Sequence, residues 1–153
     1  MAGGFSINVN NIEKFKEFLI NKYNNLYIKN DSFKNLYLDS LILPTALNDE
    51  FYKNIEVLSP FGAGNPEPKF LIEDLKLVNS NIVANKHIKA IFYSKSNEVV
   101  KTIAFNSIGT LLESYLVKNN KTLMNIVGTL ISNTWNGKKN IEFVINDISV
   151  NNT

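Results

Sequence analysis

The sequence predicts a mainly β protein with some α-helix: a five-stranded barrel over residues 69–150, preceded by a smaller α/β segment over residues 1–58. Two observations predict this fold class. Apolar residues recur at helical spacing before residue 58 and mostly at every second position after residue 68. Residues 59–68 contain three of the chain's four prolines, which are incompatible with a helix interior or a central strand. We therefore expect these residues to form a hinge between two domains.

The α/β segment is predicted to hold two helices and one strand. An amphipathic helix should begin at Asn10 or Asn11, because apolar residues then recur at helical spacing. Residues 36–43, rich in apolar side chains, are predicted to form a strand that Pro44 ends, and a second helix should start at Thr45 or Asn48. These elements alone cannot bury a large core, so the segment is interpreted as the last part of a larger domain.

After the hinge, strands are expected at residues 69–78, 87–93 and 99–105. A helix with one apolar stripe follows over residues 108–116. Two more strands, at residues 122–131 and 140–148, meet at Asn136-Gly137, a strong signal for a two-residue hairpin turn. Strand-strand-strand-helix-strand-strand is the order of an OB barrel, which commonly binds oligonucleotides.

Composition narrows the classes of site that this chain can hold. The sequence has no cysteine and a single histidine, His87, so disulfides, thiolate chemistry and His clusters are excluded. No Gly-rich phosphate loop, nucleophile elbow or His-based dyad occurs. We therefore predict no catalytic residue, no metal site and no small-molecule substrate in this chain.

Charge is distributed unevenly along the chain. Residues 1–68 carry six Lys against eight acidic residues, whereas residues 69–153 carry ten Lys against six, a net charge of +4. A basic second half suits a polyanionic partner. The sequence shows neither a signal peptide nor an apolar run of membrane-spanning length, so we expect a cytoplasmic protein without membrane contact.

The first candidate binding surface is one face of the strand at residues 87–93. His87, Lys89 and Tyr93 alternate on that face, and Lys86 precedes them. Lysines neutralise phosphates and an aromatic ring stacks on a base, which are the ingredients of sequence-tolerant single-strand binding. The alternative interpretation is a solvated strand face with an incidental Tyr.

The second candidate surface is the hairpin between the last two strands. It brings together amide, aromatic and basic side chains: Asn133, Trp135, Lys138 and Lys139. This position corresponds to a ligand-binding loop of OB folds. The alternative is that Trp135 packs across the hairpin while the lysines only increase solubility.

Several motifs together resemble one protein family. They are Leu58-Ser-Pro-Phe-Gly-Ala-Gly-Asn-Pro-Glu-Pro68, Lys86-His-Ile-Lys89, Ile103-Ala-Phe105, Asn133-Thr-Trp-Asn-Gly137 and Ile145-Asn-Asp-Ile148. In this order they resemble the C-terminal part of the RecJ family, bacterial exonucleases specific for single-stranded DNA. The resemblance extends over essentially the whole chain.

The resemblance implies that residues 1–58 are the end of a DHHA1 domain and that residues 69–150 are the OB domain. Ala2, Gly4 and Phe5 match the end of a family motif that holds nucleic acid, so Gly3 and Gly4 are candidates for a remnant of a phosphate contact. The catalytic DHH domain, which holds Mn²⁺ or Mg²⁺ in the family, has no counterpart here. We therefore expect a fragment without a cofactor of its own.

Three hypotheses about function follow from the resemblance. The preferred one is a single-stranded-DNA-binding OB module of a RecJ-type 5′→3′ exonuclease in DNA repair and recombination. The second is a non-catalytic subunit that completes a separate DHH-domain polypeptide. The third is a non-functional gene remnant.

Overall fold

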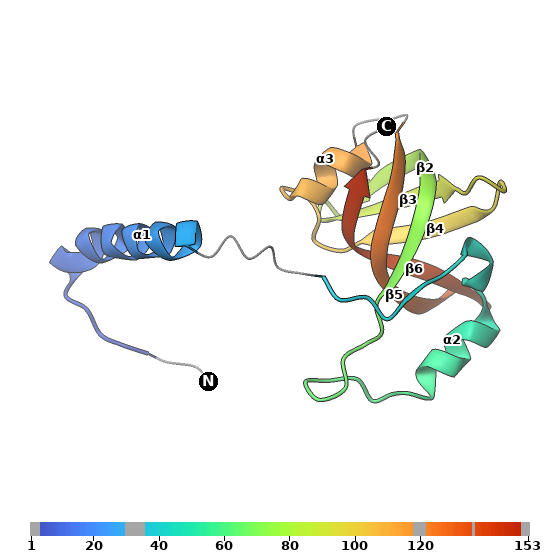
Figure 1. The fold of residues 1–153 in the computed structure, drawn as a ribbon, viewed down its shortest axis with the longest axis horizontal. Helices are drawn as coiled ribbons and strands as arrows, with labels where there is room; N and C mark the ends of the chain where they lie inside the picture. The colour runs from blue at the N-terminus through green and yellow to red at the C-terminus, as the bar shows by residue number, and fades with distance from the viewer. Residues whose placement is uncertain (1–3, 30–35, 118–121, 136, 151–153) are drawn as a thin grey trace. The chain divides into compact units, whose positions relative to one another are not determined.

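A computed structural model of the chain describes residues 4–29, 36–117, 122–135 and 137–150. It divides the chain into two compact units, Met1–Leu36 and Tyr37–Thr153, which we describe separately. Figure 1 shows the helices and strands of both units and labels the longer ones. In the parts of the chain that are described, none of the helices is long and apolar enough to cross a membrane.

The first unit contains a short 3-10 helix, η1 (Val9–Asn11), followed by the helix α1 (Ile12–Lys29). The cap lies at Asn8, before the predicted Asn10 or Asn11: the Asn8 side chain accepts a hydrogen bond from the Asn10 N–H at 3.0 Å. That contact satisfies one of the backbone donors left unpaired at a helix start. The predicted helix is therefore present, with its start shifted by the 3-10 turn.

Aromatic side chains gather on one side of this first unit. The Phe15 ring lies 5.0 Å from Phe5 in an edge-to-face arrangement and 6.5 Å from Phe18. Ile12 and Leu19, which share the predicted apolar stripe, are each about half exposed. Within its own unit, α1 thus leaves much of its apolar surface open to solvent.

The second unit begins with a two-residue strand, a 3-10 turn and a helix: β1 (Ser40–Leu41), η2 (Pro44–Ala46) and α2 (Asp49–Glu56). The strand expected over residues 36–43 pairs with its neighbour only at β1, which lies parallel to the first barrel strand. The side chain of Asn48 caps α2 by accepting the Phe51 N–H at 2.9 Å. Ile55 is buried, and the Phe51 ring packs 5.5 Å from that of Phe70.

Five strands form the barrel: β2 (Phe70–Val83), β3 (His87–Tyr93), β4 (Val99–Ala104), β5 (Leu123–Trp135) and β6 (Lys138–Val150). The strand order is β2-β3-β4-β6-β5, and β5 pairs back with β2, which closes the sheet. All these pairings are antiparallel except β4 with β6. This is the predicted five-stranded OB barrel (Figure 1).

The first barrel strand, β2, pairs with β5 in its first half and with β3 in its second. It changes register between Ile72 and Leu75, where Asp74 adopts a φ of 57°. A bulge of this kind bends a strand strongly, so one strand can take part in both halves of the barrel. Strand β2 is therefore kinked at Asp74.

The helix α3 (Leu111–Val117) contributes the fully buried Leu116 to the core. Figure 1 shows α3 and α2 against opposite ends of the barrel. Apolar side chains from all five barrel strands fill the interior between them, including Ile72, Phe92 and Phe143.

At Gly128 in β5, an added Cβ would collide with the carbonyl oxygen of Val144. The register of β5 and β6 changes beside this glycine, which allows the two backbones to approach closely.

The segment from residue 37 to residue 58 lies in the same compact unit as the barrel. Its Ile42 and Ile55 belong to the barrel's core cluster, and Phe61 of the Pro/Gly stretch packs against that cluster. The Pro/Gly stretch itself makes a tight turn in which Gly62 and Asn65 exchange backbone hydrogen bonds of 2.8 and 3.1 Å. The division into residues 1–58, 59–68 and 69–150 remains a prediction from sequence, whereas the compact units divide between residues 36 and 37.

Candidate nucleic-acid interface

The candidate interface begins with the alternation of β3. Ile88, Ala90 and Phe92 are buried in the barrel, while the side chains between them face outward. His87, Lys89 and Tyr93 therefore share the outer face, as the sequence predicts.

Neighbouring strands complete this outer face because residues opposite each other in an antiparallel sheet project to the same side. Tyr93 lies between Lys76 and Val99, and Ile91 lies between Asn79 and Lys101. We call this surface the three-strand face; its members are Lys76, Asn79, Asn81 and Val83 of β2, His87, Lys89, Ile91 and Tyr93 of β3, and Val99, Lys101, Ile103 and the following Phe105 of β4.

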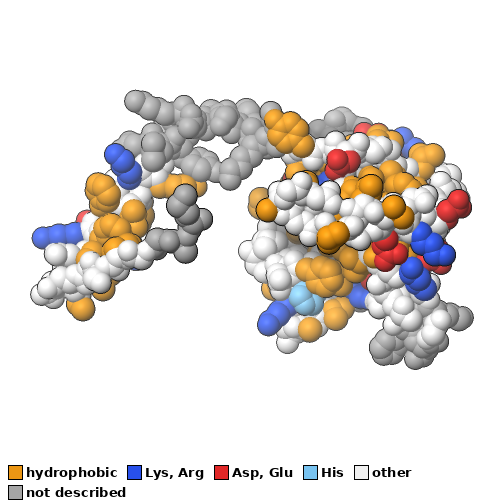
Figure 2. Space-filling view, turned by 90° about the horizontal axis from the view of Figure 1, so that it is seen from below, with side chains coloured by type: hydrophobic (Ala, Val, Ile, Leu, Met, Phe, Trp, Pro, Cys, Tyr) orange, Lys and Arg blue, Asp and Glu red, His pale blue; other side chains and the backbone are white. Residues whose placement is uncertain are grey.

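His87 is held in place at one end of this face. Its Nδ1 accepts a hydrogen bond from the Asn106 N–H at 2.9 Å, and its ring meets Phe105 edge-on at 5.2 Å. Figure 2 shows the histidine among hydrophobic side chains, with lysines nearby. Because Nδ1 is an acceptor here, Nε2 carries the ring proton and can donate to a ligand.

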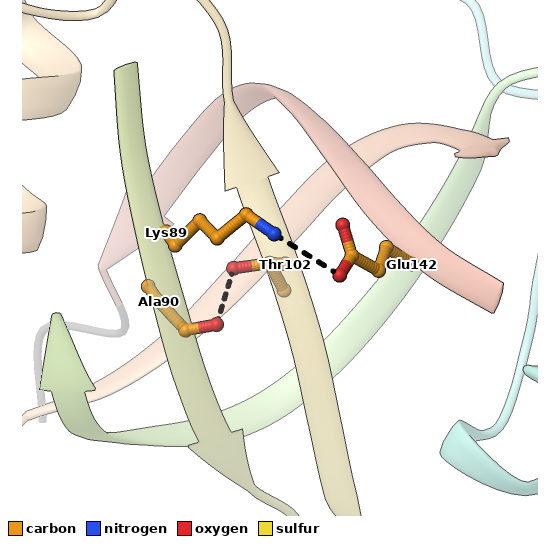
Figure 3. Close-up of polar contacts among 4 residues, drawn as sticks. All are labelled: Lys89, Ala90, Thr102 and Glu142. Atoms are coloured by element: carbon orange, nitrogen blue, oxygen red, sulfur yellow. Dashed lines mark hydrogen bonds and ion pairs between the residues drawn. The ribbon is translucent and has the colours of Figure 1, made fainter. Parts of the chain in front are cut away.

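Lys89 forms an ion pair that spans three strands. Its Nζ lies 3.4 Å from Oε1 of Glu142 on β6, and Figure 3 shows the Lys89 side chain crossing β4 to reach it. Ile103, the β4 residue opposite Lys89, is only 6% exposed although it faces outward. Thr102 donates a hydrogen bond to the Ala90 carbonyl at 3.0 Å beneath this crossing. Lys89 thus covers part of the sheet as well as adding charge.

Glu142 is unusually placed for a carboxylate. Its side chain is 12% exposed, and its Oε2 is buried without a hydrogen-bond partner among the described residues. A buried carboxylate needs compensation by a nearby cation, and Lys89 supplies it. Lys89 can contact a phosphate only if its ammonium group binds the phosphate and Glu142 together, or if it breaks its ion pair with Glu142.

Three other lysines on or beside the three-strand face form no ion pair with the residues that the structure describes. They are Lys76, Lys86 and Lys101, and all three are exposed. Lys86 was predicted from the sequence, whereas Lys76 and Lys101 were not. The signal for Lys101 was the alternation of residues 99–105, which places it on the face that the antiparallel pairing brings beside Tyr93.

The hairpin of β5 and β6 has the predicted turn. Trp135 pairs with Lys138 across Asn136-Gly137, and Gly137 has a φ of 74°, a value that glycine adopts readily. Asn133 is exposed and pairs with Asn140.

The side chains of Trp135 and Lys138 lie outside the described part of the structure, as do Asn136 and Gly3, so their predicted roles stay predictions. Gly4 is exposed and has no neighbouring atom near its Cβ position.

Lys139 of the hairpin faces α2. Its Nζ lies 3.9 Å from Oδ1 of Asp49 and 5.0 Å from the centre of the Tyr52 ring. Burial raises the pKa of Tyr52 above its ordinary value of 10.0, and the nearby Glu56 adds to the increase. The sequence did not indicate that α2, assigned to the preceding domain, would lie against the hairpin.

A groove of about 380 Å³ connects the two candidate surfaces. Two strands contribute to its lining, with Val99 and Lys101 from β4 and Lys139, Asn140 and Ile141 from β6. Pro44, Leu47, Asn48 and Asp49, from η2 and the start of α2, complete the lining. Val99 and Lys101 also belong to the three-strand face, so this groove opens onto it.

Comparison with known proteins places the chain in a family. The family described as the RecJ OB domain matches residues 38–147. This chain belongs to the RecJ OB-domain family. The matched region begins near the start of the second compact unit, so it includes α2 as well as the barrel.

Individual RecJ proteins match the chain over nearly its full length. The single-stranded-DNA-specific exonuclease RecJ of Bacillus subtilis (strain 168) is 28% identical over 152 residues, which are 98% of this chain and 19% of that protein. Crystal structures of RecJ from Thermus thermophilus in complex with Mn²⁺ and with Mg²⁺ superpose with TM-scores of 0.62 and 0.64 at 22% identity. They share the fold of this chain, and the match covers 98% of this chain and 21% and 22% of theirs. The chain therefore spans about a fifth of the length of these RecJ relatives.

The RecJ structures from Thermus thermophilus contain Mn²⁺ or Mg²⁺. Among the residues described, no three His, Asp or Glu side chains lie together in a group that could hold a metal ion. The residues that the structure describes thus offer no carboxylate or histidine cluster for a divalent metal ion.

Proposed function

We propose that this chain is the single-stranded-DNA-binding OB module of a RecJ-type 5′→3′ exonuclease. In this proposal it guides the strand towards a DHH catalytic core located outside these residues and serves DNA repair and recombination. The three-strand face is the observation that carries the proposal, because it combines uncommitted lysines with exposed apolar and aromatic side chains.

Each part of the three-strand face has a distinct role in the proposal. Lys76, Lys86 and Lys101 neutralise backbone phosphates, which provides sequence-independent affinity. Tyr93 offers a ring on which a base stacks, a contact that contributes about 1–3 kcal/mol per base. His87 donates from Nε2 to a phosphate or base acceptor. The hairpin residues Asn133, Trp135, Lys138 and Lys139 stay in the proposal as a second contact region.

Fluorescence anisotropy with a labelled oligo-dT at low salt tests the proposed function. Loss of one phosphate contact should reduce the slope of log affinity against log salt concentration by about 0.7 for a single strand. We therefore expect Lys101→Ala and Lys86→Ala each to weaken binding and to flatten this slope. Duplex DNA and an RNA oligonucleotide of the same length are the competing ligands.

Lys95→Ala is the matched control for these substitutions. It removes the same charge from an exposed lysine. Lys95 lies in the turn between β3 and β4, and its Nζ already forms an ion pair with Asp74 of β2 at 2.8 Å. Binding that is absent in the unmodified chain, or that Lys101→Ala and Lys95→Ala weaken equally, would rule out the three-strand face as the binding surface.

A second function is favoured by the apolar side chains of α1. Ile12, Phe18 and Leu19 are about half exposed in the first unit, and exposed apolar surface of this kind commonly docks on a partner. We propose as the alternative that α1 joins this chain to a separate DHH-domain polypeptide.

Mixing the chain with the DHH region of a RecJ protein should then give a stable complex that Leu19→Ser weakens, with Lys16→Ser as the control. Separate elution of the two proteins in size-exclusion chromatography would contradict it.

Cellular location and the absence of membrane contact remain predictions from the sequence. A cytoplasmic location fits a DNA-binding module, and fractionation of cells with an antibody against the chain would test it.

A further inference from the structure

The groove beside the three-strand face lies next to the short pairing of β4 with β6. Their parallel ladder joins Thr102 to Phe143 and Ile103 to Val144. The groove is lined by residues that precede these pairs in both strands, from Val99 in β4 and from Lys139 in β6. The segment from Pro44 to Asp49 closes its far side, so one wall comes from outside the barrel strands.

The lining of the groove combines cationic and apolar groups. Lys101 stands on the β4 wall and Lys139 on the β6 wall, whereas Leu47, Val99 and Ile141 supply apolar surface. The single acidic group among the lining residues, Asp49, already lies within 3.9 Å of Lys139. The charge of this groove therefore favours an anion that also carries an apolar or aromatic part.

The volume of the groove limits the size of its ligand. About 380 Å³ lies near the lower end of the range for small-ligand pockets, about 300–1,000 Å³. This volume suits one nucleotide better than a folded nucleic-acid element. The base can rest on Leu47, Val99 and Ile141 while Lys101 and Lys139 approach its phosphates.

The groove continues the path expected for a bound strand. Val99 and Lys101 lie directly opposite Tyr93 and Ile91 of β3, so a strand stacked on Tyr93 reaches the groove across one neighbouring strand of the sheet. We propose that the groove takes one nucleotide of the single strand bound on the three-strand face, with the Pro44–Asp49 segment as its second wall. This inference rests on the proposed function and adds a defined subsite to it.

The absence of cysteine from the sequence allows a sharp test. Leu47→Cys places a unique thiol in the groove, which a maleimide can block after the protein has folded. Val57→Cys is the control, because Val57 follows the last residue of α2, is 81% exposed and does not line the groove. Circular dichroism of both variants before and after labelling checks that the fold is intact.

Two measurements are then made with oligo-dT of about 16 nucleotides, the upper end of OB site sizes. Saturating oligo-dT should slow maleimide labelling of Leu47→Cys at least several-fold and leave labelling of Val57→Cys unchanged. Blocking the groove thiol should weaken binding about tenfold, as expected when one stacked base and its phosphate contact are lost. Blocking the control thiol should leave the affinity unchanged.

The outcomes separate the groove from the proposed function. If the unmodified chain binds oligo-dT, but neither protection nor weakening occurs at Leu47→Cys, the groove inference is wrong and the three-strand face stands. Equal protection at both thiols also overturns the inference, because it indicates general shielding. If the unmodified chain does not bind oligo-dT at low salt, the proposed function fails, and the groove inference fails with it.

Discussion

The ion pair between Lys89 and Glu142 connects the stability of the barrel to its proposed binding surface. Lys89→Met removes the cation but keeps an aliphatic stem of similar length over Ile103. Glu142 is then left as a carboxylate that is 12% exposed and has no compensating charge. Glu142→Gln removes the anion instead and leaves Lys89, which is 43% exposed, free to turn to solvent.

The expected size of the effect lies between two known limits. Exposed ion pairs contribute about 0–1 kcal/mol, whereas removing one partner of a buried pair costs about 3–5 kcal/mol. Because Lys89 is half exposed and Glu142 is nearly buried, we expect Lys89→Met to lower the free energy of unfolding by about 2 kcal/mol. Glu142→Gln should cost at most about 1 kcal/mol, since it leaves no buried charge.

Binding should change in opposite directions in the two variants. Glu142→Gln removes a negative charge from beside the three-strand face and releases Lys89 for a phosphate, so affinity for oligo-dT should increase about three- to tenfold. Lys89→Met should reduce it. Urea denaturation of the two single variants and the double variant gives the coupling free energy, and anisotropy gives the affinities. A coupling below about 0.5 kcal/mol, or weaker binding by Glu142→Gln, would refute this reasoning.

Three further predictions concern stability. Gly128→Ala should destabilise the barrel by about 3 kcal/mol or more, because the new methyl group would collide with the Val144 carbonyl; an unchanged midpoint in urea would contradict the close approach. Asn48→Ala should cost about 1 kcal/mol through loss of the cap on the Phe51 N–H, with Asn54→Ala as the control. The raised pKa of Tyr52 in the folded state means that stability should fall as pH rises above about 10, and the pH profile of Tyr52→Phe should be flatter there.

Local patterns predicted most of the barrel. The alternation of residues 87–93 identified both the extent of β3 and its outward side chains, because side-chain direction in a strand depends only on its period of two. The turn at Asn136-Gly137 followed from backbone conformations that few residues adopt. Predictions of this kind held because their causes lie within a few residues of the chain.

Predictions that required knowledge of distant neighbours were less complete. The apolar stripe of α2 was visible in the sequence, but its packing on Phe70 and the orientation of Lys139 towards Tyr52 were not. The proline-rich stretch as a domain boundary stays a prediction, and the sequence did not indicate that Ile42 and Ile55 before it would join the barrel's core cluster. A hydrophobic stripe indicates that a partner exists and does not identify it.

Local sequence patterns were thus enough to predict the order of the strands along the chain and the alternation of their faces, and the motifs indicated the RecJ family. Which charged side chains form ion pairs depended on the closed barrel. Lys89 was predicted as a phosphate contact, and its ion pair with Glu142, a residue 53 positions further along the chain, could not be read from the sequence. Lys101 lies beside the groove because β4 pairs with both β3 and β6. The spacing of apolar residues and the conformational preferences of turn residues depend on neighbours a few positions away. Ion pairs and grooves depend instead on distances that barrel closure sets between residues far apart in sequence.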